Sequence, residues 1–120
     1  MPEKSTKRGV VSGEILSRLA DVIESRKASS PESSYVASLL HGDETRVLKK
    51  IGEETVELVV AIRGGVREEI IHETADLWFH SLVALAGRGV RVESVLDELE
   101  RRFGVSGHDE KSSRGLKTPT

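Results

Sequence analysis

Two pairs of acidic residues are the features of this 120-residue sequence most suited to chemistry. Glu54 and Glu57 form the first pair, and Glu73 and Asp76 form the second. The members of each pair lie three residues apart, a spacing that places both side chains on one face of a helix. Hard divalent cations prefer oxygen ligands such as carboxylates. The spacing therefore indicates two acidic helix faces that could bind a metal ion.

A Gly64-Gly65 turn between the pairs could bring them together. Glu54 and Asp76 each lie eleven residues from the second glycine. Glu57 and Glu73 each lie eight residues from it. In an antiparallel helix hairpin folded at this turn, each acid should face the level of its counterpart, and all four should converge within about one helical turn.

Four carboxylates gathered beside a helix–helix contact would repel one another strongly without a cation. Magnesium favours carboxylates together with substrate phosphates, so the pattern predicts a magnesium–phosphate site. The alternative is an ordinary solvated helix face, because Asp and Glu make up 20 of the 120 residues. The symmetric placement of two pairs about one turn favours the metal site.

Several neighbours of the acids have both a functional and a structural interpretation. Lys50 could contact a phosphate as a point charge, or form a surface ion pair with the acid four residues later. His80, one turn after Asp76, could orient a ligand carboxylate or touch substrate, or it could be a satisfied core histidine. Gly52 within a helix could permit close approach of another helix or a ligand. Trp78 is expected in the core or at a subunit interface.

Apolar residues recur at helical spacing, and no convincing strand alternation is present. We predict an all-α bundle with a long central antiparallel helix hairpin. The second helix should start at Pro31 behind a Ser30 cap. The expected domain spans residues 12–104, between a flexible N-terminal segment, 1–11, and a polar C-terminal tail, 105–120. The predicted helices are 12–26, 31–40, a third from Asp43 or Thr45 to residue 63, 66–88 and 93–103.

Composition narrows the functional classes. The absence of cysteine excludes a disulfide framework, a thiolate zinc site and a cysteine nucleophile. A net charge of -2 and an aromatic content of 3% argue against nucleic-acid binding. The longest apolar stretch, 77–86, is too short to span a membrane, and no signal peptide is recognisable. We therefore expect a cytoplasmic protein with neither a membrane nor a nucleic-acid partner.

The acidic residues also form a recognisable motif, Glu53-Glu54-x-x-Glu57 followed by Glu73-x-x-Asp76. This motif resembles that of the MazG-like all-α nucleotide pyrophosphohydrolases. Within that superfamily, the chain is most similar to the phosphoribosyl-ATP pyrophosphatases of histidine biosynthesis. The closer resemblance rests on Ser34-Tyr35, Lys49-Lys50-x-Gly52, Ala75-Asp76-Leu77-x-x-His80 and Arg101-Arg102-x-Gly104-x-Ser106-Gly107-x-x-Glu110-Lys111.

The resemblance implies hydrolysis of 1-(5-phosphoribosyl)-ATP to 1-(5-phosphoribosyl)-AMP and pyrophosphate. It implies a homodimer or higher homo-oligomer that completes the bundle. It also implies Mg²⁺ bound by Glu54, Glu57, Glu73 and Asp76, with Glu53 as a helper that aligns or deprotonates water. Lys49, Lys50, Arg102 and Lys111 are the expected phosphate contacts.

Two rival interpretations remain open at this point. One is a house-cleaning pyrophosphohydrolase of the same fold that acts on nucleoside or deoxynucleoside triphosphates. The other is a non-catalytic helical interaction module that docks through the apolar second half of the fourth helix. Magnesium binding and substrate preference separate the three.

Overall fold

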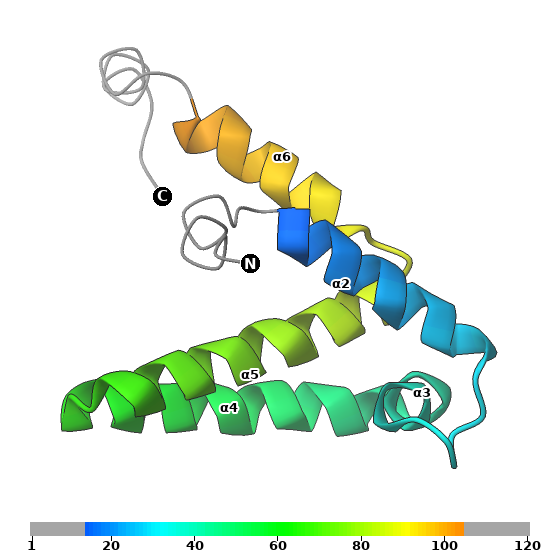
Figure 1. The fold of residues 1–120 in the computed structure, drawn as a ribbon, viewed down its shortest axis with the longest axis horizontal. Helices are drawn as coiled ribbons and strands as arrows, with labels where there is room; N and C mark the ends of the chain where they lie inside the picture. Colours follow the sequence, from blue (N-terminus) through cyan, green and yellow to red (C-terminus); the bar gives the residue numbers. More distant parts are fainter. Residues whose placement is uncertain (1–13, 105–120) are drawn as a thin grey trace, which may run out of the picture.

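The computed structural model describes residues 14–104, and this part of the chain contains helices and no strands. The all-α prediction is confirmed, and the predicted boundaries of the long helices are correct to within one or two residues. Figure 1 shows α4 and α5 packed side by side, with α2 and α6 together on the far side of α5. The elements are α2 (Glu14–Ser25), the 3₁₀ helix η1 (Arg26–Ala28), α3 (Tyr35–His41), α4 (Glu44–Gly64), α5 (Arg67–Gly87) and α6 (Val92–Phe103).

The predicted hairpin is formed by α4 and α5, which contact each other more extensively than any other pair of elements. It turns at Gly65, whose φ of 79° lies in the left-handed region that favours glycine. The Gly65 amide donates to the Ala61 carbonyl at 3.0 Å and so closes the end of α4. This capped turn sets the register between the two helices and therefore the heights of the four acids.

The start of α3 differs from the sequence prediction. Pro31 was expected as its first residue, behind Ser30, but residues 31–33 form a turn, closed by a Ser33 amide that donates to the Ser30 carbonyl at 3.0 Å. Ser34 is the cap instead, since its Oγ accepts from the Ala37 amide at 3.1 Å. Both serines suit an N-cap, and the local turn decides between them. As a result Tyr35 becomes the first residue of α3.

The core lies where α2 and α3 pack against the C-terminal half of α5 and the start of α4. Ile23 and Val83 are its most completely buried large side chains, at 0% and 1% exposure. Each such side chain contributes roughly 1.5–3 kcal/mol through burial. The core cluster consists of Ala20, Ile23, Leu39, Val47, Leu82, Val83, Ala86 and Val92.

The face of α4 that points away from α5 is apolar and uncovered in the single chain. Val47 on α4 is buried, whereas Leu48, Val59 and Ile62 of the same helix are at least half exposed. Trp78 on α5 is also 55% exposed, which excludes it from the core of one chain. No helix among residues 14–104 is long and apolar enough to cross a membrane.

The predicted domain, 12–104, contains all of the described residues. The predicted flexible segment, 1–11, and the predicted tail, 105–120, lie outside them. These boundaries stay predictions.

Candidate metal centre on the helix hairpin

Three of the four predicted acids meet across the hairpin. One carboxylate oxygen from each of Glu54, Glu57 and Glu73 lies within 4.8 Å of the other two. The first two come from successive turns of α4 and the third comes from α5, as the symmetry about the glycine turn indicated. We call these three residues the carboxylate cluster.

Asp76 does not complete this cluster. Its Oδ2 lies 3.3 Å from Nε2 of His72, one turn earlier on the same helix. Asp76, His72 and Glu73 form a second group of possible ligands, and Glu73 is common to both groups. The sequence places Asp76 at the height of Glu54, but its carboxylate is not one of the three that meet in the carboxylate cluster. A partner on its own helix holds Asp76 at the edge of the cluster.

Burial makes the cluster electrostatically unusual. Glu54 is only 5% exposed, so it lies within the buried face of α4. The Oε1 atoms of Glu54 and Glu73 are buried and have no hydrogen-bond donor. Burial, together with the nearby Glu57 and Glu54 carboxylates, raises the pKa of Glu73 above its usual value.

This donor set suits a hard divalent cation. Buried carboxylate oxygens without donors are costly unless a positive charge neutralises them. All ligands of the carboxylate cluster are oxygens, which is the preference of magnesium and calcium and not that of zinc or copper. The residues present therefore fit the cofactor that the resemblance implies.

Lys50 is the positive side chain nearest the cluster. Its Nζ lies 3.4 Å from Oε2 of Glu54 and 3.9 Å from Oε1 of Glu53. The Glu54 carboxylate raises the pKa of Lys50; burial opposes this, and Tyr35 adds a smaller increase. The lysine thus remains charged next to the acids. Both interpretations of Lys50 remain open, because the ion pair with Glu54 leaves other ammonium protons free.

The other α4 candidates are not part of the carboxylate cluster. Glu53 is about half exposed and reaches it only through Lys50. Lys49 is exposed and, among the described residues, forms no ion pair with the acids. Its position on α4 faces the uncovered side of the helix, so within one chain it does not contribute to the cluster.

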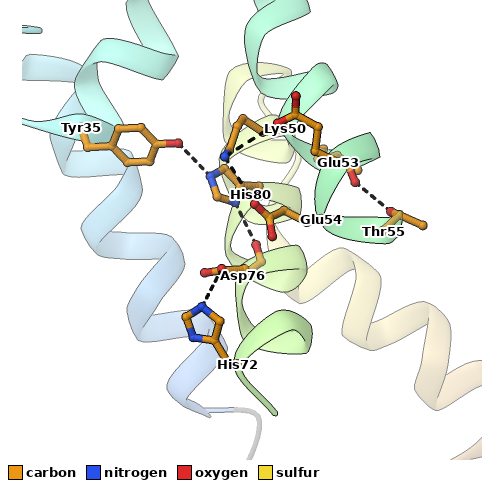
Figure 2. A network of polar contacts seen from close by, with 9 residues as sticks. Tyr35, Lys50, Glu53, Glu54, Thr55, His72, Asp76 and His80 are labelled. Carbon is orange, nitrogen blue, oxygen red and sulfur yellow. Dashed lines mark hydrogen bonds and ion pairs between the residues drawn. The ribbon is translucent and has the colours of Figure 1, made fainter. Parts of the chain in front are cut away.

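His80 is buried and both of its ring nitrogens are engaged. Its Nδ1 lies 2.9 Å from the backbone carbonyl of Asp76, and its Nε2 lies 2.9 Å from the Tyr35 hydroxyl. Figure 2 shows the imidazole between Tyr35 of α3 and the acids of the hairpin. His80 is therefore a buried histidine with both ring nitrogens hydrogen-bonded, as in the structural interpretation of this residue. No ring nitrogen is left free to bind substrate.

Tyr35 and His72 were given no role from the sequence. His72 could have been found, because it lies four residues before Asp76 on the same helix face. Tyr35 could not, because its partner His80 is 45 residues away and only the fold brings them together.

The last two candidates are not part of the hairpin site. Arg102 lies near the C-terminal end of α6, where its Nε donates to Glu98 Oε2 at 2.8 Å. Figure 1 shows that end of α6 far from the middle of the hairpin, so the structure does not bring Arg102 to the acids within one chain. Lys111 lies outside the described residues.

The fold and the site together define an all-α protein that gathers buried carboxylates on a helix hairpin, where they can hold a divalent cation. A family model for phosphoribosyl-ATP pyrophosphohydrolase matches residues 16–103, which is most of the sequence. The chain belongs to this family, and the resemblance deduced from its motifs is confirmed.

Proposed function

We propose that the protein hydrolyses 1-(5-phosphoribosyl)-ATP in a magnesium-dependent reaction of histidine biosynthesis in the cytoplasm. The water oxygen bonds to the α-phosphorus, and the bond from that phosphorus to the α,β-bridging oxygen breaks. Phosphoribosyl-AMP and pyrophosphate are the products. Family membership supports the substrate, and the buried, donor-free oxygens of Glu54 and Glu73 are the observation that supports the site.

Glu54, Glu57 and Glu73 would hold Mg²⁺, and Asp76 adds a fourth carboxylate next to Glu73. The bound ion would neutralise charge on the triphosphate and lower the pKa of an adjacent water. The role of His72 beside Asp76 is to fix the orientation of that carboxylate, as hydrogen-bonded neighbours of metal ligands commonly do.

The remaining polar groups of α4 take the other roles. Glu53 is exposed enough to receive the proton that the attacking water loses. Lys50, charged and next to Glu54, is placed to contact a phosphate oxygen of the substrate. The structure gives Lys49 and Arg102 no comparable position in one chain, so the proposal assigns them no role.

A second copy of the chain is proposed to cover the uncovered face of α4. Apolar side chains there are 50–64% exposed, and an exposed patch of this kind usually marks an interface. The family resemblance implies the same association. The residues of this outer face are Leu48, Val56, Val59, Val60 and Ile62.

The proposed activity is tested by measuring pyrophosphate release with Mg²⁺ from phosphoribosyl-ATP and from a panel of nucleoside and deoxynucleoside triphosphates. Wild-type protein should prefer phosphoribosyl-ATP, and Glu57→Gln should lower kcat/KM by about 100-fold or more. Glu68→Gln, which removes the same charge from an exposed position on α5, is the matched control. Preference for a deoxynucleotide would favour the house-cleaning enzyme, and unchanged turnover of Glu57→Gln would contradict the metal assignment.

A further inference from the structure

Tyr35 is the most unusual side chain near the carboxylate cluster that the proposed mechanism leaves without a role. The Ser34 cap fixes it as the first residue of α3. Its ring stacks on Phe79 of α5, with centroids 6.4 Å apart and planes 20° apart, and it meets the edge of His80 at 5.9 Å. The residue as a whole is nevertheless 49% exposed. It is therefore held firmly and is still accessible to a ligand.

The hydrogen bonds of His80 determine where the Tyr35 proton points. The backbone carbonyl of Asp76 can only accept, so Nδ1 of His80 must donate to it. In the neutral imidazole Nε2 is then an acceptor, and the Tyr35 hydroxyl donates to it at 2.9 Å. The donor–acceptor direction of both hydrogen bonds, from Tyr35 to His80 and from His80 to Asp76, is therefore fixed by one backbone carbonyl.

A phenol has one proton and two lone pairs. Because the proton is used at His80, the Tyr35 oxygen can offer only acceptor positions to a further partner. Figure 2 shows this hydroxyl at the end of the site where Lys50 and Glu54 meet. Tyr35 lies near enough to Lys50 to contribute to its raised pKa.

We propose that Tyr35 is a substrate-binding residue whose oxygen accepts a hydrogen bond from a hydroxyl or amino donor of the nucleotide, and that His80 is the positioning residue that fixes this polarity. The inference rests on the proposed function. It deepens that function by assigning a contact outside the phosphates, since phosphate oxygens are acceptors and cannot pair with an acceptor. The donor comes from a sugar or from the base.

The test is a cycle that combines Tyr35→Phe with substrate analogues. The analogues are phosphoribosyl-ATP derivatives that each lack one ribose hydroxyl, and one in which oxygen replaces the exocyclic nitrogen of the base. Tyr35→Phe should lower kcat/KM for the natural substrate by about fivefold to tenfold, the usual worth of one neutral hydrogen bond. For the analogue that lacks the correct donor, wild-type protein should show the same loss and Tyr35→Phe no additional loss. The identity of that analogue distinguishes sugar from base.

Two His80 variants separate positioning from packing. His80→Gln retains a carbonyl oxygen that can accept the Tyr35 proton, so it should retain most of the discrimination between substrate and analogue. His80→Leu offers no acceptor and should lose that discrimination. The magnesium-dependent shift in Tm and the helical circular dichroism of each variant report whether the fold survives.

A uniform loss for Tyr35→Phe across the natural substrate and every analogue would overturn this inference, because it would mean that Tyr35 acts only through packing. The proposed function would then still stand, since wild-type protein would remain active. If wild-type protein released no pyrophosphate from phosphoribosyl-ATP, both proposals would be refuted together.

Discussion

Replacing Glu54 by glutamine removes one negative charge from the carboxylate cluster and hardly changes the shape of the side chain. Glu54 is 5% exposed, and its Oε1 has no hydrogen-bond donor. In Glu54→Gln the new amide can donate to Glu57 or Glu73, whose oxygens lie within 4.8 Å of it. We therefore expect the variant to be more stable than the wild type without divalent cations and to gain less from magnesium.

The sizes of two opposing effects determine whether Glu54→Gln raises or lowers the stability. An unsatisfied buried acceptor costs about 1–3 kcal/mol. The ion pair with Lys50, which the variant loses, lies at a partly exposed position on one helix and is worth only about 0.3–0.5 kcal/mol. The net expectation is an increase of about 1–2 kcal/mol in the free energy of unfolding. For a domain of this size, that raises Tm by roughly 4–15 °C.

Magnesium should reduce or reverse the stability advantage of Glu54→Gln. At a concentration 100 times Kd, a ligand that binds only the folded state stabilises it by about 2.7 kcal/mol. A tenfold weaker affinity at the same concentration leaves about 1.4 kcal/mol. The difference between wild type and Glu54→Gln should therefore shrink or change sign as magnesium is added.

The assay is urea unfolding at pH 7.5, in EDTA and across a magnesium series, at one fixed protein concentration because an oligomer makes stability depend on concentration. Glu68→Gln is the control, and its response to magnesium should equal that of the wild type. A wild-type stability that does not change with magnesium would refute the reasoning. An equally large gain for Glu54→Gln would show that the ion binds elsewhere.

Three further predictions concern the framework of the site. Gly65→Ala should lower the free energy of unfolding by about 1–2 kcal/mol, because a φ of 79° strains any residue other than glycine. Gly64→Ala, within α4, should raise the free energy of unfolding by about 0.5–1 kcal/mol, and urea unfolding measures both changes. The Arg91 guanidinium lowers the pKa of Glu93 to about 2. The stability that ionised Glu93 contributes should therefore be fully present above about pH 4.5 and should disappear as the pH falls towards 2. Thermal unfolding curves of Glu93→Gln and of the wild type should differ at neutral pH and coincide near pH 2. Val60→Lys on the outer face of α4 should shift the protein to monomers in sedimentation velocity, and an unchanged mass would exclude this face as the interface.

The hairpin could be predicted because its determinants are local. Apolar periodicity gives the lengths of α4 and α5, and a glycine pair interrupts both patterns at one place. The cap of α3 could not be predicted, because Ser30 and Ser34 are chemically equivalent and only a turn between them selects the second.

The sequence predicts which acidic residues form the site better than it predicts which partners their side chains contact. Counting from the turn correctly brings Glu57 and Glu73 together, because equal helix rise places them at one height. Height alone does not fix where a side chain turns. Asp76 contacts His72 on its own helix, and Arg102 pairs with Glu98, because a partner three or four residues away is within reach in every conformation of the rest of the chain.

The buried residues of α4 show that folding and function favour different residues at position 54. Val47, Glu54 and Ala61 are the three buried positions of this helix, and they recur every seventh residue, the repeat of a packing face against α5. An apolar residue at position 54 would continue that row and strengthen the hairpin. A carboxylate at position 54 departs from the apolar pattern set by Val47 and Ala61, and such departures are common at functional sites. The position that is least favourable for a lone negative charge is also the one where a cation bound between α4 and α5 is most effective, because little water competes with it there.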